Sequence, residues 1–538
     1  WALSVQGQFY FFWPLLISAL LWLAARARSN PSRWIQAGLA AVFVASLGYS
    51  VITTRTDQAF AYFDTLARMW EFALGGLLVF ILPRLRLSAA ARAVLGWTGL
   101  LAIVSCGFLL PVEGAFPGYA ALWPTLGAAA VLAGGSDSRY GANLVLASRP
   151  IAWFGDIAYS FYLWHWPLFI LFMVMTPATQ PGFVEGTTLI LMAGVLAWLT
   201  TRWIEEPIRF ASFSKKGTRH AFALGAACCL PAVALLGGWS LYTVSERAEA
   251  RSYEFSVGDP HYPGAAAVAG QAYEREESLY PHFFTLAENV PRSYFDGCHQ
   301  GLREVEAVPC RYGRPDGPVT VALVGGSHST QWLPALKQLA RRHGWTILNL
   351  TKSDCWFSSE VRPGRDTCQQ WNLNVMRLLL KNPPDYVFTL ATRAGEALEY
   401  VPDGYVQQWS ALEKLGVRVL AVRDNPWWKK RSPSDCVAVF GEGSEHCRMP
   451  RHKGLARVTP TSDGSLPGNT HILDLSRFFC DEDECFPTAG NVLIYRDRHH
   501  ISKAYVQSLT PYLEQQLSKA APELVRTGQG GLASGAGR

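Results

Sequence analysis

The stretch that decides the fold of the C-terminal half is Val321–Thr330, which reads VALVGGSHST. The apolar run predicts a buried strand, and the glycines after it permit a tight turn. Ser327 then stands where the backbone turns into a helix. A hydroxyl at such a turn is either the N-cap of that helix or a nucleophile beside free backbone N–H groups. Both interpretations are open on this stretch alone.

Similar apolar runs recur beyond this stretch and alternate with amphipathic segments. The predicted strands are 319–324, 346–350, 385–390 and 417–422. The predicted helices are 331–343, 367–382, 404–415 and 502–518. Alternation at this interval is typical of a parallel sheet that is covered by helices on both faces. We therefore expect a three-layer α/β/α domain over residues 296–525.

Ligands of such sheets bind at the carboxyl ends of the strands, so Ser327 needs a base there to act as a nucleophile. The best candidates lie in YRDRHHIS, residues 495–502, where Asp497 and His500 are spaced D-x-x-H. This spacing lets the carboxylate bond one imidazole nitrogen while the other nitrogen faces Ser327. His499 is an alternative base, although it also fits a solvated loop histidine.

The N-terminal half is apolar throughout. The chain of 538 residues is 49% hydrophobic and only 17% charged, and its apolar residues concentrate in eight stretches that can, or nearly can, cross a hydrocarbon layer of about 30 Å. These stretches are 8–25, 34–53, 69–82, 94–110, 119–133, 157–175, 187–201 and 221–243. We expect a polytopic α-helical membrane domain over 1–243, a linker or extension over 244–295, and a disordered tail over 526–538.

Basic residues between the predicted spans are distributed unevenly. One alternating set of loops holds thirteen Lys and Arg residues, and the other set holds only Arg55 and Arg68. Because positive loops stay in the cytoplasm, the chain beyond residue 243 is expected outside it. The net charge of +6 is then explained by cytoplasmic loops, and nothing in the sequence indicates a nucleic-acid partner.

The cysteines agree with this topology. Three of the eleven lie in predicted spans, and the other eight lie in the segment expected outside the cytoplasm. An even number of cysteines in an oxidising compartment predicts disulfides. Proximity alone suggests the pairs Cys298–Cys310, Cys355–Cys368, Cys436–Cys447 and Cys480–Cys485. Zinc is the alternative, but CxxC spacing and suitable histidines are missing, so no metal is expected.

Two ionisable residues fall inside predicted spans, and a third lies just before one. His165 lies near the middle of one span, and Glu71 follows Arg68 by one helical turn in another. Such groups normally face a cavity or a partner. They either line a path for a substrate through the membrane half, or they bond between helices, with Arg68 and Glu71 as an ion pair.

Ser327-His328 at a strand end, with Asp497-x-x-His500 near the C-terminus, resembles the SGNH (GDSL-like) esterase and acyltransferase family. The family's first block usually reads G-D-S-H, whereas Gly326 occupies the Asp position here. The blocks that supply oxyanion donors in the family are not recognisable: the corresponding segments read TKSDCWF (351–357) and ATRAGEA (391–397).

The membrane half resembles the acyltransferase-3 family, in the subgroup that is fused to a periplasmic SGNH domain. The blocks that carry this resemblance are WALSVQGQFYFFWPLL (1–16), ARMWEFALGG (67–76), FPGYAALWPTLGAA (116–129), FGDIAYSFYLWHWPL (154–168) and WIEEPIRF (203–210). Gln6 and Gly7 replace the two acidic residues usual in the first block. The family also carries further N-terminal spans with an acyl-transfer histidine, so the chain is expected to be N-terminally truncated.

The resemblance implies a multi-pass O-acetyltransferase of the bacterial inner membrane whose C-terminal domain lies in the periplasm. Acetyl-CoA is the implied acyl donor, no tightly bound cofactor is expected, and the implied acceptor is a cell-envelope polysaccharide such as lipopolysaccharide O-antigen. Ser327, His500 and Asp497 would act as nucleophile, base and orienting group. The alternatives are a membrane-anchored periplasmic O-acetyl esterase and a transporter of lipid-linked sugars. The sequence does not predict an oligomeric state.

Overall fold

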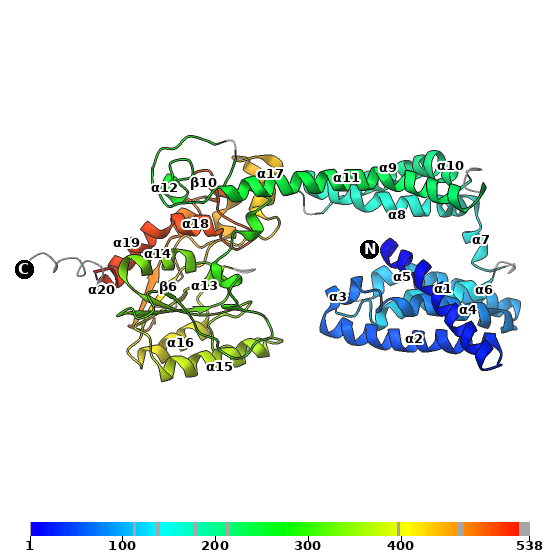
Figure 1. Cartoon of the computed structure of the whole chain (residues 1–538), viewed down its shortest axis with the longest axis horizontal. Coiled ribbons are helices and arrows are strands. Elements are labelled where there is room, and N and C mark those ends of the chain that lie inside the picture. The colour runs from blue at the N-terminus through cyan, green and yellow to red at the C-terminus, as the bar shows by residue number, and fades with distance from the viewer. Residues whose placement is uncertain are drawn as a thin grey trace, which may run out of the picture. The chain divides into compact units, whose positions relative to one another are not determined.

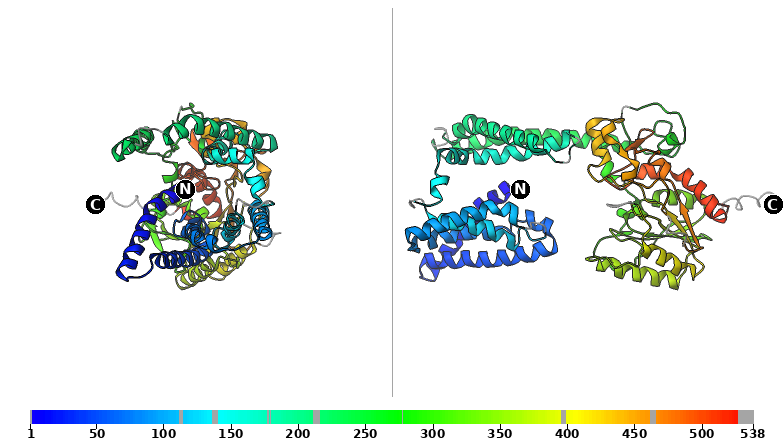
Figure 2. Two further views of the ribbon diagram at one scale, coloured as in Figure 1. Left: turned by 90° about the vertical axis from the view of Figure 1, so that its right-hand side faces the viewer. Right: turned by 180° about the vertical axis from the view of Figure 1, so that it is seen from behind.

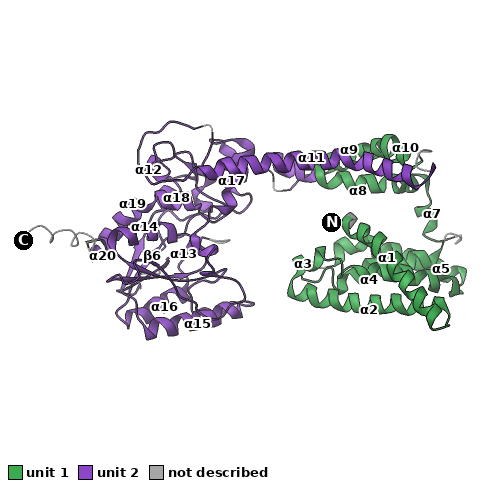
Figure 3. Cartoon of the chain, in the orientation of Figure 1, with its two compact units in different colours: residues 1–168, 185–210 green, residues 169–184, 211–538 purple. Residues whose placement is uncertain are grey.

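The computed structural model describes residues 2–110, 114–135, 140–176, 178, 180–210, 216–276, 278–394, 399–460 and 466–526. Two compact units are present (Figure 3). One comprises Trp1–Leu168 and Glu185–Phe210, and the other comprises Phe169–Val184 and Ala211–Arg538. The tail that was predicted to be disordered lies outside the described residues, except for Arg526.

Helices make up the N-terminal half. They are α1 (Ala2–Arg26), α2 (Pro31–Thr56), α3 (Gln58–Phe63), α4 (Met69–Ile81), α5 (Ala89–Leu109), α6 (Leu122–Gly134), α7 (Asn143–Leu146), α8 (Arg149–Met175), α9 (Phe183–Thr200), α10 (Glu206–Arg209) and α11 (Thr218–Ser252). A π-helical turn, Thr201–Glu205, joins α9 to α10. Each of the eight predicted spans lies inside one of these helices or extends beyond it by at most three residues.

Six of these segments are long and apolar enough to cross a membrane: Ser4–Arg26, Pro31–Thr56, Ala89–Leu109, Arg149–Met175, Phe183–Arg209 and Thr218–Ser252. The other two predicted spans correspond to α4 and α6, which are shorter helices of 13 residues each. The large apolar side chains of these helices are widely exposed, as hydrocarbon-facing surfaces are. The protein is therefore a multi-pass membrane protein.

Glycines let α5 and α6 pack backbone against backbone. A Cβ atom built on Gly99 would lie 2.5 Å from the carbonyl oxygen of Gly127, and one built on Gly134 would lie 2.9 Å from the Cα of Gly96. Small residues at such crossings replace the hydrophobic driving force that lipid does not supply, because close backbone approach gains van der Waals contact.

The C-terminal half is an α/β domain with the sheet order β1-β4-β3-β5-β6-β8, and β2 also pairs with β4. The strands are β1 (His299–Gln300), β2 (Cys310–Gly313), β3 (Thr320–Gly325), β4 (Thr346–Lys352), β5 (Tyr386–Leu390), β6 (Arg418–Val422) and β8 (Thr470–Leu473). All pairs are parallel except β2 with β4. The predicted parallel sheet is thus confirmed, and β1, β2 and β8 extend it.

Helices cover both faces of this sheet, as the three-layer prediction requires. Figure 1 and the right-hand view of Figure 2 show α15 (Asp366–Lys381) and α16 (Asp403–Glu413) on one face. The other face carries α14 (Leu333–His343), α18 (Lys503–Ser508) and α19 (Thr510–Ala520). The central strands are buried on both sides, with Val321–Val324 at most 1% exposed. The short helices α12 (Ala265–Val268), α13 (Ser327–Thr330), α17 (Pro433–Phe440) and α20 (Pro522–Arg526) complete the domain.

The segment predicted as a linker, 244–295, is divided between two structures. Its first residues continue α11 to Ser252. The remainder packs on the α/β domain, where Phe255 and Ala265 belong to the main hydrophobic core. Ala265 N–H donates to Ser508 Oγ at 2.9 Å, and Asn491 Nδ2 donates to the His261 carbonyl at 2.8 Å. This region is thus an integral part of the domain.

Four disulfides tie the α/β domain together. They join the cysteines in sequence order: Cys298–Cys310, Cys355–Cys368, Cys436–Cys447 and Cys480–Cys485. The first holds β2 beside β1 at the edge of the sheet, and the second anchors the turn that follows β4 to the start of α15.

Candidate active site

Ser327 lies at the carboxyl end of β3, where the chain turns into α13. Gly326 is the N-cap of that helix and Ser327 is its first residue, so the interpretation of Ser327 as an N-cap is wrong. Gly325 has φ +131°, and a Cβ there would collide with Ser329 Oγ. Glycine is needed because both the backbone angle and the space exclude a side chain.

The absence of the family's aspartate at position 326 also has a structural basis. A Cβ atom on Gly326 would lie 3.1 Å from the carbonyl oxygen of Cys355. Any side chain here would therefore press on the backbone at Cys355. Gly326 instead lets the turn after β3 contact the turn after β4.

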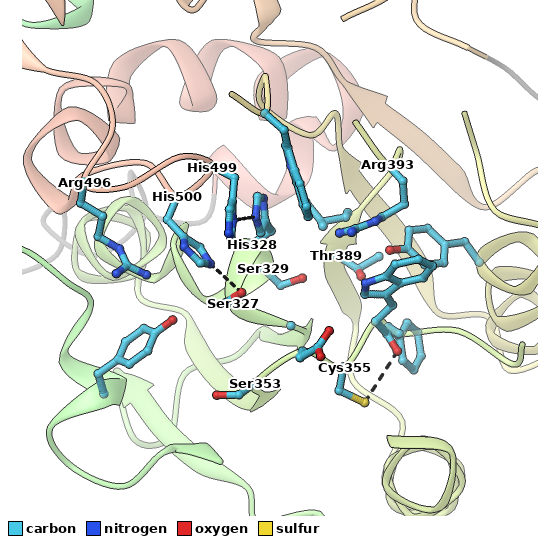
Figure 4. Close-up of a pocket in the computed structure, with 18 residues that line it drawn as sticks. Ser327, His328, Ser329, Ser353, Cys355, Thr389, Arg393, Arg496, His499 and His500 are labelled. Carbon is cyan, nitrogen blue, oxygen red and sulfur yellow. Dashed lines mark hydrogen bonds between the residues drawn. The ribbon is translucent and has the colours of Figure 1, made fainter. Parts of the chain in front are cut away.

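Ser327, His500 and Asp497 are brought together in one chain of hydrogen bonds. Ser327 Oγ lies 2.8 Å from His500 Nε2, as Figure 4 shows. On the opposite side of the ring, His500 Nδ1 lies 2.7 Å from Asp497 Oδ2. Asp497 Oδ1 accepts the backbone N–H groups of His499 at 2.9 Å and of His500 at 2.8 Å. The carboxylate is thus fixed by its own loop, as in an Asx turn.

Burial and hydrogen bonding set the charges of this chain. Burial acts to raise the pKa of Asp497, but the hydrogen bond from His500 and two backbone N–H groups outweigh it, so the pKa lies well below its usual range. Burial lowers the pKa of His500 to about 4, although Asp497 opposes the shift. At neutral pH the carboxylate is therefore ionised and the imidazole neutral, so His500 Nδ1–H donates to Asp497 and Nε2 accepts from Ser327 Oγ–H.

A second histidine–aspartate chain lies beside the first. His328 Nδ1 lies 2.7 Å from Asp424 Oδ1, and His328 Nε2 lies 2.9 Å from His499 Nδ1. Trp427 stacks on both imidazoles and donates its indole N–H to Asp424 Oδ2 at 3.1 Å. His499 is thus a half-buried member of a network, and the alternative of a solvated loop histidine is wrong.

The protonation of the second chain follows from its electrostatics. Burial acts to raise the pKa of Asp424, but the interaction with His328 outweighs burial, so the pKa lies below its usual value. Burial also lowers the pKa of His328, and it lowers the pKa of His499 to about 4. With Asp424 ionised and both rings neutral, His328 donates to Asp424 and His499 donates to His328. His499 Nε2 then carries no proton.

The two chains border a cavity of about 470 Å³. Gly326, Ser327, His499 and His500 line one side of it. The turns after β4 and β5, for which no oxyanion block was recognised, supply much of the rest, including Ser353, Cys355, Trp356 and Arg393. Of the segment 391–397, residues 395–397 lie outside the described part of the chain.

The imidazoles of His328, His499 and His500 offer nitrogens within 4.8 Å of one another, a grouping that can hold a metal. In this structure both ring nitrogens of His328 and of His500, and Nδ1 of His499, are engaged in hydrogen bonds to a neighbouring ring, to Ser327 or to a carboxylate. A metal bound to all three rings would break the Ser327–His500 bond, so the geometry favours proton transfer.

The three candidate residues in the membrane half do not form one site. Arg68 NH1 lies 2.8 Å from Glu71 Oε1, and its guanidinium lies 4.8 Å from the centre of the Phe116 ring. His165 Nδ1 lies 3.3 Å from the Phe161 carbonyl of its own helix. Among the described residues, no contact joins His165 to the Arg68–Glu71 pair.

His328 and Asp424 are members of the site that sequence reasoning missed as functional residues. Asp424 follows β6 directly, at the same edge of the sheet as Ser327. The rule that sites gather at the carboxyl ends of parallel strands would have pointed to it.

Two protein families account for most of the chain. A family described as "Acyltransferase domain" matches residues 1–202, and one described as "SGNH domain (fused to AT3 domains)" matches residues 297–515. The chain therefore carries an acyltransferase domain over residues 1–202 and, after it, an SGNH domain of the kind that is fused to such domains.

Among curated proteins, the chain is 31% identical over 204 residues to "Putative membrane-bound transacylase BcsY" of Komagataeibacter xylinus, covering 37% of this chain and 48% of that protein. It is 25% identical over 225 residues to "Peptidoglycan O-acetyltransferase OatA" of Listeria monocytogenes, covering 40% of this chain and 35% of that protein. The chain thus spans about half, or less, of the length of these relatives.

Among solved structures, a match covering 38% of this chain and 84% of the other is "Structure of Salmonella ser. Paratyphi A lipopolysaccharide acetyltransferase periplasmic domain", with 12% identity and a TM-score of 0.28. Such a low score supports no functional argument.

Proposed function

We propose that the protein takes part in the O-acetylation of a cell-envelope polysaccharide, with the membrane half delivering the acyl group and the α/β domain passing it to a sugar hydroxyl. The observation that carries this proposal is the chain Ser327–His500–Asp497, with links of 2.8 and 2.7 Å. Both families and the printed names of the curated relatives support acyl transfer to glycans.

The chemistry proceeds in two halves. His500 Nε2 removes the Ser327 proton while Oγ attacks the acyl carbonyl carbon, and the same imidazolium returns the proton to the leaving group. An acceptor hydroxyl then gives its proton to His500 and attacks the acyl-serine, which releases acetylated sugar and restores Ser327. Asp497 stabilises the imidazolium in both halves. The N–H of Ser327 opens α13, so no helix bond uses it, and it is our first candidate for an oxyanion donor.

We place the protein in the bacterial inner membrane, with the α/β domain in the periplasm and acetyl-CoA as the cytoplasmic donor. The uneven loop charges and the four disulfides support this orientation. A cell-envelope polysaccharide on the periplasmic side, such as lipopolysaccharide O-antigen, is the acceptor class that this topology makes accessible.

The test compares Ser327→Ala with the unaltered sequence, each expressed as the full-length natural protein in a host that lacks its own enzyme. We expect the polysaccharide isolated from the variant to lose its O-acetyl groups, as measured by proton NMR. Normal acetylation by the variant would remove Ser327 from the pathway. A chromogenic acetyl ester, supplied with and without a sugar acceptor, separates transfer from esterase activity, because an esterase releases acetate only.

A further inference from the structure

Tryptophans and arginines stack on one another at one side of the cavity beside Ser327. The guanidinium of Arg393 lies 4.1 Å from the ring centre of Trp356 and 4.5 Å from that of Trp427. Arg362 lies 4.0 Å from Trp356. Arg393 lines the cavity, as Figure 4 shows, and Arg362 does not.

Arg393 is buried, with only 8% of the residue exposed. In the described part of the chain its guanidinium has no hydrogen-bond acceptor, whereas its backbone pairs with Tyr400. The Asp424 carboxylate, whose pKa Arg393 helps to lower, supplies a nearby opposite charge without a hydrogen bond. The N–H donors of the guanidinium have therefore lost water without gaining an acceptor, which is unfavourable.

Other arginines of the domain donate hydrogen bonds to carboxylates, hydroxyls or backbone carbonyls. Arg423 is 3% exposed and bonds Glu399, Asp474, Ser476 and the Ala456 carbonyl. Arg362 donates to the Asp354 carbonyl at 3.1 Å. Asp354, the carboxylate that lines the same cavity as Arg393, is paired with Arg365. Arg393 therefore differs from them as a buried guanidinium that lines the cavity and that, among the described residues, bonds no acceptor.

The stacking determines which chemistry Arg393 can offer a ligand. Two indoles lie against the guanidinium, so its N–H donors remain available along the edge of the plane. A guanidinium edge matches the paired oxygens of a carboxylate or a phosphate. Trp356 is itself stacked by two guanidinium groups, and Trp427 by Arg393 and two imidazoles. The faces of both indoles are thus already covered and are not available to stack on a sugar. We therefore expect a ligand to be recognised by its charge, through the guanidinium of Arg393.

We propose that Arg393 binds an acidic substituent of the glycan acceptor, a carboxylate or a phosphate, and thereby selects acidic sugars for the cavity of Ser327. This inference rests on the proposed function for the role of the sugar as acceptor. Arg393 acts as a specificity residue, since it sorts acceptors by charge and takes no part in the attack by Ser327.

Binding tests this inference without turnover. The full chain carrying Ser327→Ala is purified in detergent and titrated by calorimetry with glucuronate, glucose 6-phosphate and glucose. We expect at least one acidic sugar to bind about tenfold or more tightly than glucose, since a charge-assisted hydrogen bond is a strong one. The acidic sugar that binds identifies the group as carboxylate or phosphate.

Two arginine variants provide the contrast. Arg393→Gln should abolish the preference for the acidic sugar, and Arg393→Lys should retain part of it. Arg362→Gln is the matched control, because Arg362 stacks on the same indole outside the cavity, and it should keep the preference within twofold. An unchanged preference in Arg393→Gln, in a protein whose unfolding midpoint is unaltered, would overturn the proposal, as would equal binding of glucose and both acidic sugars.

A second readout separates selectivity from chemistry. In the background with Ser327 intact, Arg393→Gln should reduce acetyl transfer to the acidic sugar about tenfold more than transfer to glucose, whereas Arg362→Gln should leave the ratio of the two unchanged. An equal loss of transfer to both sugars in Arg393→Gln would assign Arg393 to the chemical step and refute its role as a selector. Charge-selective binding without any acyl transfer by the parent protein would refute the proposed function alone.

Discussion

His328 and His499 lie 171 positions apart in sequence, yet Nε2 of the first is 2.9 Å from Nδ1 of the second. This contact places the Asp424 chain alongside the Asp497 chain, with the ring centres of His499 and His500 only 4.1 Å apart. Each carboxylate orients an imidazole, but only His500 bonds Ser327. The two aspartates are therefore expected to differ in their effect on the reaction.

Asp497→Asn should slow acylation of Ser327 by roughly three orders of magnitude or more, because an amide neither fixes the His500 tautomer nor stabilises the imidazolium. Stopped-flow measurement of product released from a chromogenic acetyl ester reports this step. Asp435→Asn, at an exposed position in the first turn of α17, is the matched control and should retain the parent rate. A loss of less than tenfold in Asp497→Asn would show that the carboxylate is dispensable.

Asp424→Asn should leave ester cleavage within about tenfold of the parent, while it lowers the free energy of unfolding by about 2 kcal/mol, the usual contribution of a buried hydrogen bond to a charged group. Chemical denaturation followed by tryptophan fluorescence measures the second quantity. If cleavage fell as far as it does in Asp497→Asn, the His328–His499 chain would have to take part in proton transfer.

The rate of Ser327 acylation should keep its full value well below pH 6.5. Burial holds the pKa of His500 at about 4, so the base becomes protonated, and activity falls, only as the pH approaches that value. Protonation of His500 also affects the stability of the folded domain, which falls, like the rate, toward acid pH. The folded pKa is lower than the unfolded one, so stability is fully present above about pH 6.5 and declines as the pH falls toward 4.

A pH profile of the acylation rate between pH 3.5 and 8 tests this expectation. His499 also has its pKa lowered to about 4 by burial, so the profile should be repeated with His499→Gln. In that variant the acylation rate should still fall to half its maximum near pH 4. A fall to half the maximum near pH 6.5 in the parent protein would contradict the buried, neutral state of His500.

The disulfide Cys355–Cys368 should matter for activity as well as for stability, since Cys355 lines the cavity. Replacing both cysteines with alanine removes a bridge between residues 13 apart and should destabilise the domain by about 2–3 kcal/mol. It should also slow ester cleavage severalfold. Cys436–Cys447 joins residues 11 apart away from the cavity, and its removal should cost similar stability without slowing cleavage.

Gly99→Val should disrupt the membrane half, because its new Cβ would press on the Gly127 carbonyl in α6. Overpacking of this kind costs about 1–3 kcal/mol. Gly107 lies in the same helix with nothing within 4 Å of a new Cβ, so Gly107→Val is the control. Unfolding midpoints in detergent should fall for the first variant and remain unchanged for the second.

The central strands could be predicted from sequence because a parallel sheet buries both faces and therefore needs unbroken apolar runs. Strand β8 escaped prediction since Thr470–Leu473 is short and mostly half-exposed. The helix predicted over 502–518 is two helices, α18 and α19, that meet at Leu509. Pro511 stands in the first turn of α19, a position that proline favours.

Within the site, Asp497 and His500 could be found because their relationship is local, one helical turn in length. The pairing of His328 with Asp424 spans 96 positions and leaves no periodic trace. That the Arg393 guanidinium bonds no acceptor among the described residues likewise depends on the folded surroundings. What sequence reasoning lacked was the spatial order of the strands, which determines whose ends are neighbours.

Ser327 follows β3, early in the domain, whereas His500 lies in the loop before α18, and this order has a consequence during biosynthesis. A nascent chain that has emerged only through β8 carries the nucleophile but neither the base nor its aspartate. Ser327 thus lacks its base until residues 497–500 have been synthesised and have folded beside α13. The order of the residues in the chain therefore makes assembly of the nucleophile a late step in the folding of this domain.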